Sequence, residues 1–105
     1  MIRRFGQIAK LRTERIEEYD TLHAAVWNDV LKTIKKCNLQ NYSIYREGNL
    51  LFAYFEYTGT DYEADMAKMA SDPATQSWWT HTHPCFIQEH AGEFYTDMKE
   101  LFHID

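Results

Sequence analysis

Three aromatic side chains at four-residue intervals, Tyr19, His23 and Trp27, form the pattern in this chain best suited to chemistry. On an α-helix, residues four apart lie on one face, one above the next. An imidazole with a pKa near ~6.5 both gives and takes protons at neutral pH, and aromatic rings pack on apolar faces of small ligands. A later Trp78-Trp79 pair offers further aromatic surface. Together these residues indicate proton transfer on a small molecule.

The same spacing is also typical of the buried stripe of an amphipathic helix, and this alternative stays open. Val30 and Ile34 extend the stripe, with His23 in its middle. Neighbouring residues of a helix point about 100° apart, so Trp78 and Trp79 cannot face one ligand in the same way. One tryptophan of the pair can therefore be structural.

Length and composition predict one domain over residues 1–105. Hydrophobic residues at 45% and aromatic residues at 15% suffice for one core and an aromatic-lined pocket. A net charge of −5 without a basic run argues against a nucleic-acid partner. No signal or membrane-spanning pattern follows Met1, so we expect a soluble cytoplasmic protein without a membrane partner. Cys37 and Cys85 lack CxxC spacing, which indicates reduced cysteines.

Periodicity and capping residues predict the elements. The first half contains a strand over residues 1–11, a long helix over 14–37 after a Thr13 N-cap, and strands over 41–45 and 50–57 joined by Glu47-Gly48-Asn49. Asn38 suits the left-handed end of the long helix. The second half contains a helix after a Thr60–Glu63 capping box, a helix from Asp72-Pro73 that stops before Pro84, and a last strand over 98–104. Residues 83–97 lack a clear periodicity.

This order predicts an α+β, ferredoxin-like fold: a four-stranded antiparallel sheet with helices on one face. Strands with aromatic residues on both faces need a cover on the side that the helices leave open. We therefore expect two such sheets to pack together in a homodimer, a dimeric α+β barrel. In each subunit the ligand is expected between helix and sheet.

The chain resembles the L-rhamnose mutarotase family. The resemblance rests on Tyr19-x-x-x-His23-x-x-x-Trp27, on Asn41-Tyr42-Ser43-Ile44-Tyr45 before Asn49-Leu50-Leu51-Phe52-Ala53, and on Trp78-Trp79. It covers most of residues 1–82 and resumes at Leu101-Phe102-His103. Each motif alone is weak, but their order and spacing together are quite specific.

The resemblance implies a dimeric, cofactor-free isomerase that interconverts the α and β anomers of L-rhamnose. The proton donor of the family then falls on His23, and its sugar-contacting positions fall on Tyr19, Tyr42, Trp78 and Trp79. From the sequence alone, Tyr42 is equally a core residue of a strand. Opening a pyranose hemiacetal requires one proton to reach the ring oxygen while another leaves the anomeric hydroxyl, and His23 suits the first transfer. The sequence identifies no second proton-transfer group.

The chain departs from the family near its C-terminus. Many members carry a proline- and asparagine-rich segment after the double tryptophan, whereas this chain has His83-Pro84-Cys85-Phe86-Ile87-Gln88-Glu89-His90. If that segment closes the pocket, the preferred sugar changes. L-Fucose or another 6-deoxy sugar is therefore an alternative substrate.

Three further hypotheses compete with this interpretation. His81, His83, Cys85 and His90 are residue types that ligate zinc, although their spacing fits no standard closed site, and solvated loop histidines are the simpler explanation. Small dimeric ferredoxin-like barrels also include cofactor-free monooxygenases and haem-degrading enzymes with flat, apolar substrates. A non-catalytic sugar sensor is the third hypothesis, in which His23 contributes to affinity and not to turnover.

Overall fold

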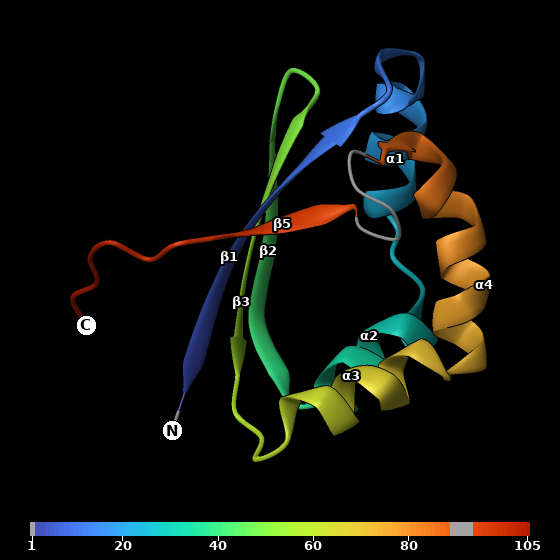
Figure 1. The fold of residues 1–105 in the computed structure, drawn as a ribbon. Helices are drawn as coiled ribbons and strands as arrows, with labels where there is room; N and C mark the ends of the chain where they lie inside the picture. Colours follow the sequence, from blue (N-terminus) through green and yellow to red (C-terminus); the bar gives the residue numbers. More distant parts are fainter. Residues whose placement is uncertain (1, 89–93) are drawn as a thin grey trace.

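An antiparallel sheet around strand β1 organises the molecule in the computed structural model, which describes residues 2–88 and 94–105 (Figure 1). The strands are β1 (Arg3–Leu11), β2 (Leu39–Glu47), β3 (Leu50–Tyr57), β4 (Phe86–Ile87) and β5 (Tyr95–Met98). The helices are α1 (Ile16–His23), α2 (Asn28–Lys36), α3 (Tyr62–Ala70) and α4 (Pro73–Thr82), with short 3₁₀ turns η1 (Thr13–Arg15) and η2 (His83–Cys85).

The strand order is β2-β3-β1-β4, and β5 also pairs with β1. β3 occupies one edge of β1 from Arg3 to Lys10, so β4 and β5 must share the other edge. β4 pairs at Lys10 and Leu11, and β5 pairs from Gly6 to Ala9. The predicted ferredoxin-like order is confirmed, with two short strands in the place of the single fourth strand.

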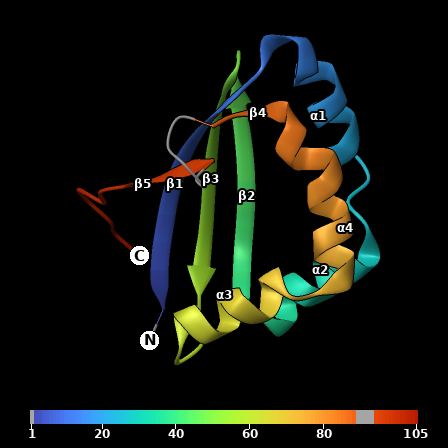
Figure 2. The same cartoon turned by 45° about the vertical axis from the view of Figure 1, so that its right-hand side comes forward.

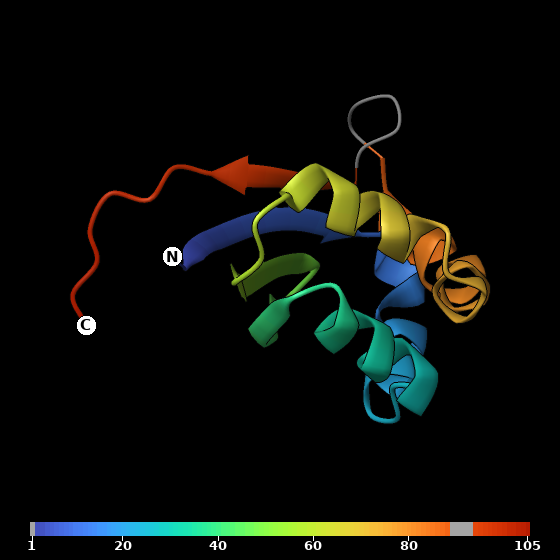
Figure 3. The ribbon, with the colours of Figure 1, turned by 90° about the horizontal axis from the view of Figure 1, so that it is seen from below.

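The four helices lie on one face of this sheet, as predicted (Figures 1 and 2). The sheet curls into a half-barrel that is open on the side of the helices (Figure 3). Strand β3 shows the consequence for the side chains, because Leu51, Ala53, Phe55 and Tyr57 are buried while the intervening residues are only half-buried. The buried set faces the helices, since alternate residues of a strand point to opposite faces.

The prediction of one helix over residues 14–37 is wrong. The chain leaves helical geometry after His23, and Trp27 has extended backbone angles, φ −63° and ψ 138°, before α2 begins at Asn28. A straight helix of that length would measure about 36 Å at 1.5 Å per residue. The nine-residue strands span only about 30 Å at 3.3 Å per residue. The break lets α2 pack against α4 and β2 at one end of the sheet.

The hairpin and several caps follow the prediction. Gly48 has φ +59° in the turn between β2 and β3, and Asn38 has φ +67° after α2. Asp72 caps α4 by accepting the Thr75 N–H at 2.9 Å, with Pro73 at the first position. The helix stops before Pro84 as predicted.

Two predicted caps and the last strand are wrong. Thr13 already has helical geometry inside η1, whereas an N-cap lies outside the helix. Asp61, one residue after Thr60, caps α3 by accepting the Ala64 N–H at 3.1 Å. The last strand is Tyr95–Met98 and not 98–104, because β1 ends its pairing with β5 at Met98 and the chain beyond has no regular structure.

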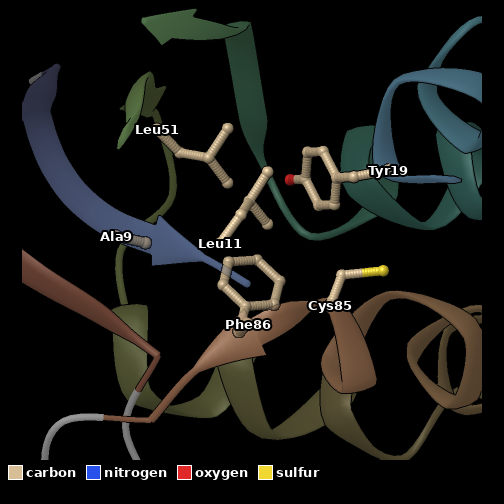
Figure 4. Close-up of a cluster of buried hydrophobic side chains, with 6 residues drawn as sticks. All are labelled: Ala9, Leu11, Tyr19, Leu51, Cys85 and Phe86. Atoms are coloured by element: carbon tan, nitrogen blue, oxygen red, sulfur yellow. The ribbon is translucent and has the colours of Figure 1, made fainter. Parts of the chain in front are cut away.

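Two buried clusters hold the sheet and helices together. One contains Ala9, Leu11, Tyr19, Leu51, Cys85 and Phe86, and Figure 4 shows Tyr19 reaching from α1 toward Leu11 and Leu51. The other contains Leu39, Phe55 and Tyr57, with methionines of α3 against it. Tyr19 therefore also packs in the core, which is the alternative that the helical spacing left open. Within the described residues, every helix is too short or too polar to cross a membrane.

Candidate active site

His23 is the last residue of α1, and a backbone contact fixes its ring. Its Nδ1 lies 3.0 Å from the carbonyl oxygen of Tyr19, one turn earlier. A carbonyl only accepts hydrogen bonds, so Nδ1 carries a proton and donates it. The lone pair of the neutral ring is then on Nε2, which has no hydrogen-bond partner in residues 2–88 and 94–105. Nε2 is thus the atom available for proton transfer.

The His23 ring lies among aromatic rings from three segments. The Tyr19 ring stacks on it with centroids 4.1 Å apart, and Trp78 of α4 presents an edge to it at 5.5 Å. Trp27, in the break between α1 and α2, packs against Trp78 at 5.1 Å. The structure therefore brings Tyr19, His23, Trp27 and Trp78 together. Trp27 does not lie on the helix that carries Tyr19 and His23, contrary to the predicted single helix.

Burial controls the protonation of His23. Desolvation lowers the pKa of this half-buried imidazole, while the hydrogen bond to the Tyr19 carbonyl and the charge of Asp20 oppose the shift. The neutral form therefore predominates at pH 7, since the ordinary pKa is near ~6.5. Burial also raises the pKa of Tyr19 to about 12, so this phenol stays protonated.

A pocket of about 280 Å³ opens beside His23. Its lining consists of Tyr19, Asp20, His23 and Ala24 from α1 and the turn after it, and Ile44, Arg46 and Leu51 from the β2–β3 hairpin. The volume is close to the lower end of ligand pockets, about 300 Å³. The pocket therefore suits a molecule of the size of a monosaccharide.

An ion pair that the sequence analysis missed spans one side of this pocket. Arg46 of β2 binds both carboxylate oxygens of Asp20, with Nε and Nη2 at 2.8 and 2.6 Å. Its Nη1 donates to the carbonyl of Gly48 at 2.8 Å. The hydrogen bond from Arg46 is the main cause that lowers the pKa of Asp20, which is therefore ionised near His23. The three-residue spacing of Asp20 and His23 on one helix could have indicated that this carboxylate lies near His23, but not that Arg46 binds it.

Tyr42 lies on the helix-facing side of β2, where its ring stacks on Phe55 with centroids 5.2 Å apart. The surrounding protein raises the pKa of its phenol even though 39% of the residue is exposed. Tyr19 and Tyr95 interact with it electrostatically. Tyr95, which the sequence analysis missed because residues 83–97 lack periodicity, places its hydroxyl 3.4 Å from that of Tyr19.

Trp79 occupies the other side of α4. It stacks on His83 at 5.1 Å and lines a broader pocket of about 660 Å³ together with Phe94 and Arg12. Trp78 is buried with 6% exposure and faces His23. The tryptophan pair is thus divided between two surfaces of one helix, as the 100° step between neighbours requires.

The residues of the competing zinc hypothesis do not gather. His81 packs on Trp27 and His83 on Trp79, while Cys85 donates toward Glu18 at 3.5 Å. His90 lies outside the described residues. Among the residues that the structure describes, no group of three or more histidine, cysteine or acidic side chains could hold a metal ion.

Comparison with known proteins adds a full-length match to this geometry. The family model described as L-rhamnose mutarotase matches residues 4–104. The chain belongs to the L-rhamnose mutarotase family. This membership confirms the resemblance found in the sequence and makes the chain an isomerase of the sugar mutarotase class.

Individual mutarotases match along nearly their whole length. The L-rhamnose mutarotase of Lactiplantibacillus plantarum is 31% identical over 103 residues, which cover 97% of this chain and 98% of that protein. The one from Oceanobacillus iheyensis is 30% identical over 107 residues, which cover 99% of this chain and all of that protein.

Solved structures support the fold. The crystal structure of an L-rhamnose mutarotase from Formosa agariphila superposes with a TM-score of 0.78 and 19% identity, covering 98% of this chain and 99% of that chain. A putative antibiotic biosynthesis monooxygenase from Caulobacter crescentus gives a TM-score of 0.57 at 14% identity, covering 94% of this chain and 90% of that chain. At these identities both comparisons show the fold alone.

Proposed function

We propose that this chain interconverts the α and β pyranose anomers of L-rhamnose by acid–base ring opening and closure, without a cofactor. The family match along residues 4–104 carries the proposal. Curated relatives named L-rhamnose mutarotase, at about 30% identity over nearly the full length, support the same substrate. The likeness to a monooxygenase concerns the fold alone and gives no support for oxygen chemistry.

His23 is the proton donor in this mechanism. Its imidazolium gives the Nε2 proton to the ring oxygen while the bond from that oxygen to the anomeric carbon breaks, and the anomeric hydroxyl gives its proton to solvent water as the aldehyde forms. Rotation about the bond between the first two carbons presents the other face, and the reverse steps close the ring. A positioned acid of this kind contributes about 10²–10⁴-fold in rate. The fixed Nδ1 contact, which leaves Nε2 available, supports this role.

The phenols and indoles bind the sugar. Burial keeps the Tyr19 phenol protonated with a pKa of about 12, which suits hydrogen bonding and not general base catalysis. Tyr42 contributes a second phenol from β2. Trp78 contacts His23 directly, whereas Trp79 lies on the other side of α4, where it lines the broader pocket with Arg12 and Phe94. Aromatic rings suit the apolar face and the methyl group of a 6-deoxy sugar.

The active form is a cytoplasmic homodimer. The face of the sheet opposite the helices carries Ile8, Phe52, Tyr54 and Met98, which the strand registers bring side by side. Within the described residues, all helices lie on the other face. Packing of two such faces would remove this apolar surface from water.

The test is NMR saturation transfer between the α and β anomeric signals of L-rhamnose, with L-fucose in parallel. We expect exchange above the buffer rate for both sugars and faster exchange for L-rhamnose. Faster exchange of L-fucose would replace the proposed substrate, and no enhancement with either sugar would contradict the mutarotase function. Oxygen consumption is measured on the same samples as a check for oxygenase activity.

A further inference from the structure

Three tyrosines from three separate elements lie on the helix-facing side of the sheet, and the hydroxyls of two of them meet. Tyr19 comes from α1, Tyr42 from β2 and Tyr95 from β5. The phenol oxygens of Tyr19 and Tyr95 are 3.4 Å apart, and Tyr42 is close enough to interact electrostatically with both. Neither periodicity nor the family motifs singled out Tyr95.

The hydrogen-bonding capacity of these phenols exceeds what the protein uses. Each hydroxyl has one donor and accepts as well, and strong O–H···O bonds place the oxygens about 2.7–2.8 Å apart. The separation of 3.4 Å is therefore a weak contact, and it uses at most one of the three donors. Within residues 2–88 and 94–105, no other hydrogen bond reaches these three oxygens. A ligand with several hydroxyl groups would satisfy them.

The ring of Tyr95 has a structural role that its hydroxyl does not share. Pairing with Ala9 fixes the backbone of Tyr95, and its ring meets Phe86 edge-on with centroids 5.4 Å apart. A phenylalanine would make the same ring contacts. Burial also raises the pKa of the Tyr95 phenol, which therefore stays neutral and keeps its proton for donation. The hydroxyl thus requires an explanation other than packing.

We propose that Tyr95 is a further substrate-binding residue, whose phenol binds one sugar hydroxyl jointly with the phenol of Tyr19. The inference rests on the proposed function and extends its site from α1 and β2 to β5. The Tyr19 ring stacks on His23 at 4.1 Å, so a sugar hydroxyl held between these two phenols is fixed relative to the proton donor. Tyr95 then sets which hydroxyl arrangement the site prefers.

The test compares wild type with Tyr95→Phe, Tyr19→Phe, the double variant and a Tyr45→Phe control. Tyr45 is 68% exposed and points away from the helices, so its hydroxyl serves as a matched control. Methyl α-L-rhamnopyranoside is the probe because it binds without ring opening. We expect its dissociation constant to rise about tenfold in Tyr95→Phe, the effect of one lost hydrogen bond, and to stay unchanged in Tyr45→Phe.

Three further readouts separate binding from a structural role. Wild type should discriminate against one monodeoxy form of the probe, and Tyr95→Phe should lose that discrimination. Because Tyr19 and Tyr95 bind one hydroxyl, the double variant should lose less affinity than the product of the two single losses. In wild type, the ¹³C signal of Tyr95 Cζ should shift on addition of saturating probe, a readout that needs no variant.

The outcomes distinguish the two proposals. A wild type that neither exchanges L-rhamnose anomers nor binds the probe overturns the proposed function and the role of Tyr95 with it. A wild type that does both, with unchanged affinity in Tyr95→Phe or no shift of the Tyr95 signal, overturns the role of Tyr95 alone.

Discussion

At the scale of single residues, one hydrogen bond determines what His23 can do. Its Nδ1 is committed to the Tyr19 carbonyl at 3.0 Å, which leaves Nε2 available for the proposed proton transfer. The types and spacing of Tyr19 and His23 predict both as candidate site residues on one helix face, and the structure brings the two into contact. Tyr95, Asp20 and Arg46 were not predictable in this way, because their contacts join segments far apart in the sequence.

The protonation of His23 gives a pH dependence with a definite sign. A donor acts as the imidazolium, and desolvation lowers its pKa, so the donor population at neutral pH is small. The enzymatic exchange rate of L-rhamnose, corrected for buffer catalysis, should therefore rise up to about tenfold from pH 7.5 to 6.5. Saturation transfer at several pH values measures this rate. A rate that falls as the pH falls would assign His23 to the base role instead.

At the scale of elements, the break between α1 and α2 shows the limit of local sequence. Ala24 and Ala25 are strong helix formers, so nothing local predicts that the helix stops there. Tertiary contacts account for the break, because the Trp27 ring packs against two rings of α4, Trp78 at 5.1 Å and His81 at 5.6 Å. The hairpin was predictable because strand-forming residues flank a turn sequence that contains Gly48. The Asp72 cap was predictable because its contact with Thr75 lies within one turn of helix.

Gly59, before α3, offers a test of packing at this scale. A Cβ there would collide with the Tyr57 hydroxyl and the Asp65 carboxylate, which hydrogen bond to each other at 2.5 Å. Gly59→Ala should therefore lower the free energy of unfolding by about 1–3 kcal/mol. Gly6→Ala is the matched control, because a Cβ there meets only Met98 at an ordinary 3.7 Å. Urea denaturation measures both, and equal stability of the two variants would contradict the crowding at Gly59.

At the scale of the whole molecule, the order of elements and the helix-covered face were predictable from the sequence. The position of the last strand was not, because pairing along β1, and not local propensity, selects Tyr95–Met98. Leu101, Phe102 and Ile104, which the sequence assigned to that strand, are 87%, 81% and 77% exposed. The C-terminal residues extend away from the sheet (Figure 3).

The proposed homodimer gives a prediction for the whole molecule. Analytical ultracentrifugation at micromolar concentration should show about twice the chain mass of 12.5 kDa. Phe52→Lys should shift the protein toward the monomer, because it places a charge on the proposed interface. Leu31→Lys is the matched control, since Leu31 is 45% exposed on α2. A monomeric wild type would contradict packing through the open face of the sheet.

The central claim is that His23 transfers the proton that opens the sugar ring. The most direct measurement is saturation transfer between the L-rhamnose anomers with wild type, His23→Ala and His103→Ala, since His103 is an exposed histidine near the C-terminus. We predict that His23→Ala lowers the enzymatic rate at least about 10²-fold with its thermal unfolding still cooperative, while His103→Ala matches wild type. A folded His23→Ala variant that exchanges the anomers as fast as wild type would contradict the claim.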